Sequence, residues 1–197
     1  MEDGLLTGAF SAAVFLDRDG TLIEHRPYLS DPDQVRLVPG AAESVARLNR
    51  SGVAAVLVTN QSGVARGFFS ETRLTSVHDR LVTLLADHGA YLDGIYYCPH
   101  LPSANIAAYR LACRCRKPGP GMVERARCEL GLEGLPTWVI GDSPCDLDLA
   151  RAVGATAVLV RTGHGRDTEQ VGPTPDLVVD TVSEAVEVIL TSRSNRE

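Results

Sequence analysis

The sequence predicts an α/β protein with a Rossmann-like parallel sheet that carries helices on both faces. Short apolar runs alternate along the chain with longer segments whose apolar residues recur at helical spacing. Several of the short runs are apolar throughout, which is typical of strands that are buried on both sides. Repeated alternation of strand and helix requires right-handed crossovers, and these place the strands parallel in one sheet.

The N-terminal half supplies three strands, each an apolar run bounded by polar or turn-forming residues. In chain order they are Ala12–Leu16, Val53–Val58 and Gly94–Tyr97. The helices between them end at glycines, and the second begins at a serine that can cap its first turn. These helices are Ala41–Arg50, ended by Gly52, and the segment from Ser70 to Gly89 with its stripe Leu74, Val77, Leu81, Leu84 and Leu85. A loop rich in proline, histidine and arginine, Ile23–Pro39, precedes the first helix.

The C-terminal half continues the same alternation. Its strands are Thr137–Ile140, Ala157–Val160 and Leu177–Val179. Its helices are Met122–Leu130 ended by Gly131, one that starts at Ser143-Pro144 and ends near Gly154, and Ser183–Leu190. The polar tail from Thr191 is expected to be loose. We expect one domain, residues 1–197 with a core of about 12–190, and no mobile cap domain because no large insertion follows the first motif.

Composition restricts the partners. The chain has 197 residues, 44% of them apolar and 22% charged, which is enough to bury a substantial core. A net charge of −6 gives no general attraction for nucleic acid, so an anionic ligand must be held by a few local cations. No apolar run is long enough to span a membrane, and Met1–Gly4 lacks the basic start of a signal peptide. We therefore expect a cytoplasmic protein without nucleic-acid or membrane partners.

Two carboxylates follow the first expected strand, in Asp17-Arg18-Asp19-Gly20-Thr21. Residues i and i+2 of an extended chain point to the same side, so Asp17 and Asp19 can share one small site. Close carboxylates raise each other's proton affinity unless a cation lies between them, which suits a metal-assisted nucleophile beside a general acid/base. The alternative is an ordinary aspartate-glycine turn, and the pentapeptide alone does not decide between the two.

The predicted fold gathers polar residues that are distant in sequence. Asp17, Thr59 and Asp142 each follow the carboxyl end of an expected strand, where ligands bind in open parallel sheets. Lys117 can join them from the loop before the Met122 helix. This set suits phosphoryl transfer, with Asp17 as nucleophile, Asp19 as proton donor and acceptor, and Thr59 and Lys117 on the phosphoryl oxygens. Asp142 would help to hold Mg²⁺; Asp146 would orient the metal ligands or serve as an acidic first-turn residue.

The four motifs Asp17–Thr21, Thr59, Lys117 and Gly141–Asp146, in this order and spacing, resemble those of the haloacid dehalogenase superfamily of phosphohydrolases. The resemblance covers nearly the whole chain. It implies an aspartyl-phosphate on Asp17, Asp19 as proton donor, and Mg²⁺ held by the Asp17 and Asp142 carboxylates and the Asp19 backbone carbonyl.

Three further segments resemble the heptose bisphosphate phosphatase group, with the histidinol-phosphate phosphatases as its nearest relative. They are Val58–Gly67, Ile95–His100 and Cys115–Pro118. The resemblance implies removal of the 7-phosphate from a heptose 1,7-bisphosphate, with histidinol phosphate or another small sugar phosphate as the alternative substrate. Substrate contacts are then expected at Tyr28, Asn60, Gln61, Ser62, Arg66 and Arg116. This group tends to carry a lysine directly after the fourth-motif aspartate, where this chain has Ser143.

A second metal site is indicated by Cys98-Pro99-His100 and Cys113-Arg114-Cys115, two close ligand pairs separated by a loop. Three thiolates and one imidazole complete a tetrahedron and leave no place for water, so we expect structural Zn²⁺. The alternative is buried free thiols with one hydrogen-bonded histidine. Cys128 and Cys145 lie on expected helices and are taken as core thiols.

Two non-enzyme classes compete with this reading. A receiver-type domain also carries acidic strand ends, a threonine and a lysine on a parallel sheet, but Asp19 would hydrolyse a phosphate that such a domain must store. A zinc-organised binding module would explain the cysteines and leave the four motifs without a role. We therefore expect a monomeric enzyme that acts on a small sugar phosphate.

Overall fold

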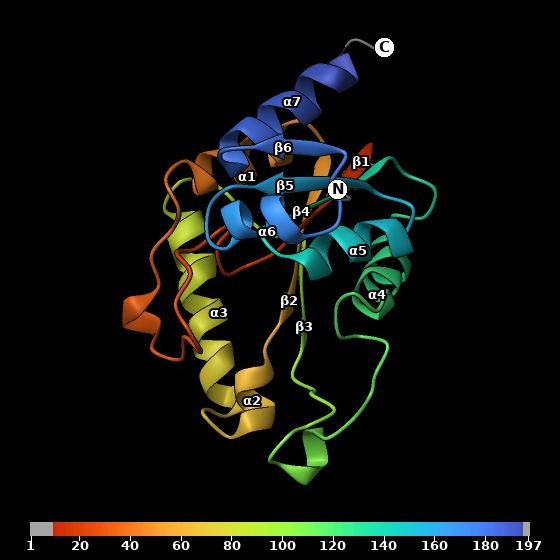
Figure 1. The fold of residues 1–197 in the computed structure, drawn as a ribbon. Helices are drawn as coiled ribbons and strands as arrows, with labels where there is room; N and C mark the ends of the chain where they lie inside the picture. The colour runs from red at the N-terminus through yellow and green to blue at the C-terminus, as the bar shows by residue number, and fades with distance from the viewer. Residues whose placement is uncertain (1–9, 195–197) are drawn as a thin grey trace, which may run out of the picture.

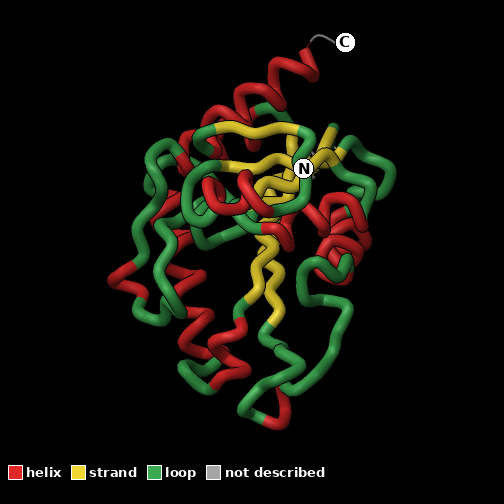
Figure 2. Tube along the Cα trace, viewed as in Figure 1, coloured by secondary structure: helices red, strands yellow, loops and turns green. Residues whose placement is uncertain are grey.

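The structure is a computed structural model that describes residues 10–194. Six parallel strands form one sheet in the order β3-β2-β1-β4-β5-β6 (Figures 1 and 2). The strands are β1 Ala12–Leu16, β2 Val53–Asn60, β3 Gly94–Cys98, β4 Thr137–Gly141, β5 Thr156–Val160 and β6 Leu177–Val179. Since β1 lies at the centre, the residues that follow it emerge between the ends of β2 and β4.

Helices cover both faces of the sheet (Figure 1). One face packs against α1 Ala41–Arg50, α3 Glu71–Ala86 and α7 Val182–Ser194, and the other against α4 Gly121–Leu130 and α5 Pro144–Ala152. Successive β1 residues alternate between the two cores: Ala12, Val14 and Leu16 face one, and Ala13 and Phe15 face the other. The site at the strand ends therefore stands on a sheet that is fixed from both sides. None of the helices in the described part has the length and apolar character needed to cross a bilayer.

The predicted fold class, its strands and its longer helices are confirmed. Two short helices were not predicted, α2 Ser62–Arg66 and α6 Gly165–Val171, because each is too short to show an apolar period. The structure also contains two 3-10 turns, η1 Pro32–Gln34 and η2 Ala107–Tyr109.

The expectation of a loose tail from Thr191 is wrong for its first four residues, since α7 continues to Ser194. The rest of the tail and Met1–Gly4 lie outside the described residues. The chain from Asp17 to Gly40 forms a loop with η1, and no inserted domain occurs between residues 10 and 194, as the absence of a cap requires.

The loop between the two cysteine pairs packs against α2: Leu101 and Ala104 are buried with Ala65 of that helix, and Tyr109 packs against them. Cys128 was taken as a core thiol, but it lies exposed on α4 because the buried stripe of that helix passes through Met122, Val123 and Ala126 instead. Cys145 is half-buried and lines the pocket described next.

Candidate active site

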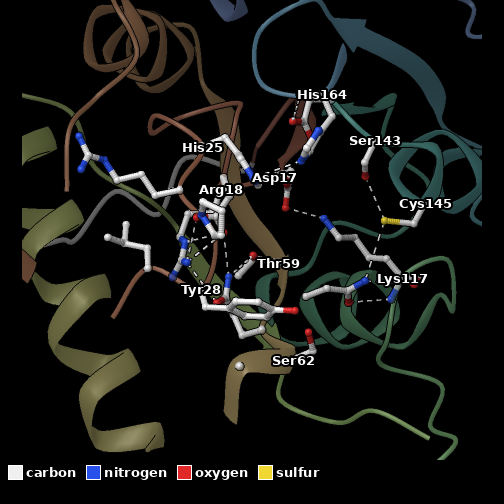
Figure 3. Close-up of a pocket in the computed structure, with 18 residues that line it drawn as sticks. Asp17, Arg18, His25, Tyr28, Thr59, Ser62, Lys117, Ser143, Cys145 and His164 are labelled. Atoms are coloured by element: carbon white, nitrogen blue, oxygen red, sulfur yellow. Dashed lines mark hydrogen bonds and ion pairs between the residues drawn. The ribbon is translucent and has the colours of Figure 1, made fainter. Parts of the chain in front are cut away.

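The carboxyl ends of β1, β2 and β4 open into a pocket of about 340 Å³ (Figure 3). Its walls come from the loop after β1, the end of β2 with the start of α2, the Lys117 loop, and the start of α5. Asp17, Asp19, Thr59, Lys117 and Asp142 all line it. The topology thus brings the predicted catalytic set together.

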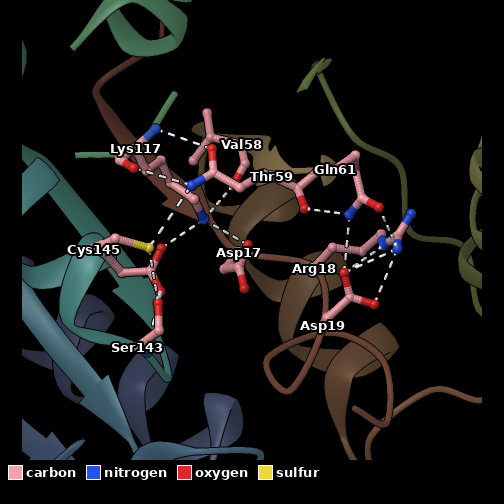
Figure 4. A network of polar contacts seen from close by, with 11 residues as sticks. Asp17, Arg18, Asp19, Val58, Thr59, Gln61, Lys117, Ser143 and Cys145 are labelled. Atoms are coloured by element: carbon pink, nitrogen blue, oxygen red, sulfur yellow. Dashed lines mark hydrogen bonds and ion pairs between the residues drawn. The ribbon is translucent and has the colours of Figure 1, made fainter. Parts of the chain in front are cut away.

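Lys117 is the electrostatic centre of this pocket. Its Nζ atom donates to Asp17 Oδ1 at 2.6 Å, to Asp146 Oδ1 at 2.6 Å and to the Val58 carbonyl at 2.9 Å (Figure 4). The side chain is 2% exposed, and the two carboxylates raise the pKa of Lys117 against the lowering effect of burial. The lysine is therefore a fixed cation directly beside the expected nucleophile.

Three buried carboxylates, Asp17, Asp142 and Asp146, place oxygen atoms within 4.8 Å of one another. Burial raises the pKa of Asp17 to about 7, with Lys117 opposing the shift and Asp146 adding to it. Burial likewise raises the pKa of Asp142 to about 6, opposed by the His164 N–H group. One lysine does not balance three carboxylates, so the cluster favours a further cation.

The hydrogen bonds distinguish the three carboxylates. Both oxygens of Asp146 are engaged, Oδ1 by Lys117 and Oδ2 by the Ser143 N–H at 3.2 Å and hydroxyl at 2.6 Å. No donor among residues 10–194 reaches Asp17 Oδ2, Asp142 Oδ1 or the Asp19 carbonyl oxygen. Hard oxygen donors of this kind suit Mg²⁺. Asp17 and Asp142 thus each keep one carboxylate oxygen open to such an ion, whereas both oxygens of Asp146 are held by Lys117 and Ser143.

Two glycines allow the Asp142 carboxylate to lie where it does. A Cβ atom on Gly20 would lie 2.1 Å from Asp142 Oδ2, and one on Gly163 would lie 2.0 Å from the same atom. Both glycines also have positive φ, +85° and +55°. The His164 N–H donates to this oxygen at 2.8 Å, and the Thr162 hydroxyl donates to the Gly20 carbonyl.

Asp19 belongs to a separate network, with its carboxylate turned toward Arg18 and Gln61 (Figure 4). Arg18 donates to both of its oxygens, Nε to Oδ2 at 3.1 Å and Nη2 to Oδ1 at 3.0 Å. Gln61 Nε2 donates to Asp19 Oδ2 at 3.0 Å and to Thr59 Oγ1 at 2.8 Å. Gln61 was predicted to contact substrate, whereas its amide here is bonded to protein.

Asn60 is occupied in a similar way. Its Oδ1 accepts from the Lys117 N–H at 3.0 Å, and its Nδ2 donates to the Lys117 carbonyl at 3.1 Å. These two bonds clamp the backbone of the lysine to the end of β2. Of the three predicted contacts at this strand end, Ser62 is the one that lines the pocket without a hydrogen bond to protein among the described side chains.

The rim of the pocket carries Tyr28, which lines it with its ring half-exposed. Tyr28 has φ +52°, packs edge-on against Phe68 with ring centroids 4.6 Å apart, and has the Arg66 guanidinium 5.8 Å from its ring centroid. The buried Nε of Arg66 has no hydrogen-bond partner in the described chain. Arg66 thus borders the pocket through Tyr28 rather than lining it.

Arg116 also lies off the pocket wall, and its Nη1 donates to the His100 carbonyl at 3.3 Å. His25 and His164 form another part of the rim, with their Nε2 atoms 3.2 Å apart. Neither His25 nor His164 was among the predicted site residues. A histidine in a loop with no motif around it carries no signal that could have singled it out.

The thiol cluster consists of Cys98, His100, Cys113 and Cys115, and the structure brings all four ligand atoms within 4.8 Å. The sulfur atoms lie 3.1 to 3.5 Å apart, and His100 Nδ1 lies 3.3 Å from Cys115 Sγ and 3.7 Å from Cys98 Sγ. A tetrahedron around zinc with bonds of about 2.3 Å has edges of about 3.7 Å, so only small movements are needed. Cys115 is two residues from Lys117, which links this cluster to the pocket.

Comparisons with known proteins agree with this geometry. A family model of HAD-hydrolase-like proteins matches residues 114–185. The D-glycero-beta-D-manno-heptose-1,7-bisphosphate 7-phosphatase of Photorhabdus laumondii is 45% identical over 158 residues, which are 80% of this chain and 84% of that protein. The enzyme of the same name from Vibrio cholerae is 41% identical over 179 residues, 90% of this chain and 96% of that protein.

Solved structures show the same likeness. A D,D-heptose 1,7-bisphosphate phosphatase from B. bronchiseptica, in complex with magnesium and phosphate, is 34% identical with a TM-score of 0.82 and covers 92% of this chain and 99% of its own. The corresponding phosphatase from Burkholderia thailandensis is 30% identical with a TM-score of 0.63, covering 91% and 99%.

Proposed function

Because the chain belongs to the D-glycero-beta-D-manno-heptose-1,7-bisphosphate 7-phosphatase family of HAD-like hydrolases, we propose that it hydrolyses the 7-phosphate of that heptose bisphosphate. The 1-phosphate would remain, which is the group that nucleotide activation of the sugar requires. The observation that carries the proposal is the Asp17 carboxylate in the pocket, paired with buried Lys117 on one oxygen and free on the other.

The first half-reaction uses Asp17 and Asp19. A carboxylate oxygen of Asp17 attacks phosphorus, and the bond from phosphorus to the sugar oxygen breaks with its electron pair on that oxygen. Asp19 gives its proton to the leaving oxygen and becomes a carboxylate. Lys117 and the Thr59 hydroxyl bind phosphoryl oxygens, where charge gathers in the transition state.

The second half-reaction regenerates the enzyme. Water attacks phosphorus of the Asp17 aspartyl-phosphate and gives its proton to the Asp19 carboxylate. The bond from phosphorus to Asp17 breaks, and its electron pair returns to the Asp17 carboxylate. The products are inorganic phosphate and an enzyme with Asp19 protonated again.

We assign Mg²⁺ to the Asp17 and Asp142 carboxylates and the Asp19 carbonyl, the oxygens that protein donors leave free. When bound, the ion would neutralise charge on the phosphoryl oxygens and the carboxylates. We assign Zn²⁺ to the thiol cluster, because three thiolates and an imidazole form a closed structural set. Its proposed role is to tether the segment that carries Arg116 and Lys117.

A second anionic group on the substrate fits the cations around the pocket. The Arg66 guanidinium forms no ion pair with any described residue, and its Nε lacks a partner. The loop Leu101–Ala112 contains no acidic residue that would favour the cationic end of histidinol phosphate. We propose that Arg66 and Arg116 recognise the retained phosphate, since guanidinium matches phosphate with two hydrogen bonds.

We also propose that the chain acts as a monomer. We propose that it forms one domain, because both cores pack on the two faces of a single sheet. A reducing compartment such as the cytoplasm suits its five free cysteines.

Histidinol phosphate remains the alternative substrate. Release of inorganic phosphate from the heptose bisphosphate and from histidinol phosphate, with and without Mg²⁺, tests the proposal. Failure to release phosphate from the heptose bisphosphate with Mg²⁺ present would refute it.

A further inference from the structure

The Gln61 side chain uses all of its hydrogen-bonding groups within the protein. Its Oε1 accepts from Arg18 Nη2 at 3.1 Å, and its Nε2 donates to Asp19 Oδ2 and Thr59 Oγ1. Turning the amide around would set its NH₂ against the guanidinium and its oxygen against the carboxylate. The network therefore closes in one orientation only, which fixes Gln61 between Arg18, Asp19 and Thr59.

Arg18 completes a holder for the Asp19 carboxylate. Two guanidinium nitrogens and the Gln61 amide nitrogen donate three hydrogen bonds to its two oxygens. Arg18 is 1% exposed, and Asp19 is its one ion-pair partner in the described chain. The neighbouring His78 is neutral, because burial and the Arg18 charge lower its pKa to about 3. The guanidinium is thus buried with a single anion to bind.

The chemistry of these donors matches one form of Asp19. Three N–H groups that point at two oxygens stabilise and orient a carboxylate. In the proposed reaction Asp19 is a carboxylate after it has protonated the leaving group, and it then takes the proton of the attacking water. The Arg18 and Gln61 donors therefore match the state of Asp19 in the second half-reaction, where it is a carboxylate, better than its protonated state in the first.

We propose that Arg18 and Gln61 are positioning residues for hydrolysis of the aspartyl-phosphate: they hold Asp19 as an oriented carboxylate that accepts the proton of the attacking water. The bond from phosphorus to the water oxygen forms as the bond from phosphorus to Asp17 breaks, and the proton goes to Asp19. Gln61 also occupies a lone pair of the Thr59 hydroxyl, which leaves the O–H free to donate to a phosphoryl oxygen. This inference rests on the proposed phosphatase reaction.

The test is the pre-steady-state hydrolysis of p-nitrophenyl phosphate by the Mg²⁺-loaded Gln61→Met variant. The p-nitrophenolate group of this substrate leaves without needing a proton, so phosphorylation of Asp17 depends little on Asp19. We expect a burst of about one p-nitrophenol per active site, followed by a steady state at least about tenfold slower than wild type. Hydroxylamine trapping should show phosphoenzyme accumulating in the variant and not in the wild type. Methionine preserves the side-chain volume, which keeps the packing of this buried position.

Asn60→Ala is the matched control at the neighbouring position. Asn60 clamps the backbone of Lys117, which serves phosphorylation of Asp17, so this variant should be slow without a burst and without trapped phosphoenzyme. Arg18→Lys keeps the positive charge and loses the two guanidinium N–H donors that bind both Asp19 oxygens, so it should behave like Gln61→Met. If Arg18→Lys fails to fold, Gln61→Met still decides.

Slow turnover of Gln61→Met without a burst would overturn the proposal, and so would wild-type kinetics in this variant. Either result leaves the proposed function intact. Failure of the proposed function looks different, because wild-type protein would then release no phosphate and give no phosphoenzyme under rapid quench.

Discussion

The Lys117 ammonium lies 2.6 Å from Oδ1 of Asp17, although the two residues are 100 positions apart in the sequence. The contact is buried, and the same ammonium also lies 2.6 Å from Oδ1 of Asp146. Breaking a buried ion pair leaves an uncompensated charge, so all three side chains depend on one another. The nucleophile and the phosphate-binding cation therefore form one electrostatic unit before any ligand arrives.

The first prediction concerns the nucleophile. Asp17→Asn should lower phosphate release by at least about a thousandfold, because the amide keeps the shape and loses the nucleophile. The far-ultraviolet circular dichroism spectrum and zinc content should stay those of wild type. Asp148→Asn on the outer part of α5 makes the same chemical change away from the pocket and should keep full activity. Turnover of Asp17→Asn within tenfold of wild type would exclude the assignment.

The second prediction separates the two metals. Brief treatment with a weak chelator should stop catalysis reversibly by removing Mg²⁺, while about one equivalent of zinc should survive dialysis. Cys113→Ser should lose zinc and make the loop Leu101–Ala112 sensitive to protease. Cys128→Ser, at the exposed cysteine on α4, should retain zinc, as measured by elemental analysis. A fully active wild-type protein that contains no zinc would contradict the assignment.

The third prediction concerns substrate choice. The ratio of kcat/KM should favour the heptose bisphosphate over histidinol phosphate by at least about a hundredfold, or roughly 2.7 kcal/mol of transition-state discrimination. Arg66→Ala and Arg116→Ala should reduce this preference more than they slow a small monoester without a second charge. Arg47→Ala, whose partner is Glu187 on α7, serves as the control arginine. Equal efficiency on both substrates would refute the heptose assignment and leave the phosphatase chemistry intact.

The fourth prediction follows from the pKa values of Asp17 and Asp142, about 7 and about 6 against 3.8 for an ordinary aspartate. A raised pKa in the folded state means that stability from these groups is lost as pH rises through those values. In metal-free protein this contribution should therefore fall between about pH 4, near the unfolded-state pKa, and about pH 7, near the folded-state pKa of Asp17. Mg²⁺ binds the ionised carboxylates, so its stabilising effect should grow over the same range. Thermal melts with and without Mg²⁺ at several pH values measure both trends, and a Mg²⁺ effect that shrinks as pH rises would contradict the site.

The fifth prediction concerns the glycine beside the metal ligand. Gly20→Ala should weaken Mg²⁺ binding by at least about tenfold, because its Cβ would displace Asp142 Oδ2 from 2.1 Å away. Gly89→Ala is the matched control, since its φ is +67° and a Cβ there meets nothing within 4 Å. Both variants carry backbone strain of about 1 to 2 kcal/mol, and only Gly20→Ala adds the collision. Mg²⁺ titration by calorimetry distinguishes them, and equal affinities in the two variants would show that the contact is unimportant.

The sheet was predictable because each strand is a short apolar run that is visible in the local sequence, such as Ala12 to Leu16 before the Asp17 turn. Strand-end chemistry followed from topology, since parallel strands deliver Asp17, Thr59 and Asp142 to one edge. These two steps require only the order of elements along the chain. They explain why the predicted catalytic residues all line one pocket.

Side-chain partners were not predictable in the same way. Gln61 and Asn60 were expected to meet substrate, yet both bind protein groups, and no local pattern reveals whether an amide points into a pocket or across it. Arg18 was not among the predicted site residues, because its burial comes from packing that sequence order does not encode. Cys128 was misplaced for a related reason, because a helix of ten residues gives little information on its buried face.

Ser143 stands where a lysine was expected, and its hydroxyl and N–H both bind Asp146 at the start of α5. A lysine there would retain the N–H contact, lose the hydroxyl contact, and bring a second ammonium toward the carboxylate that steadies Lys117. The two positions are therefore epistatic: the effect of changing residue 143 depends on what residue 146 already binds. A lysine at position 143 would attract an anionic sugar phosphate over a longer range, whereas serine holds the start of α5 more rigidly. Relatives that differ at position 143 are therefore expected to differ also at position 146 or in the Lys117 loop.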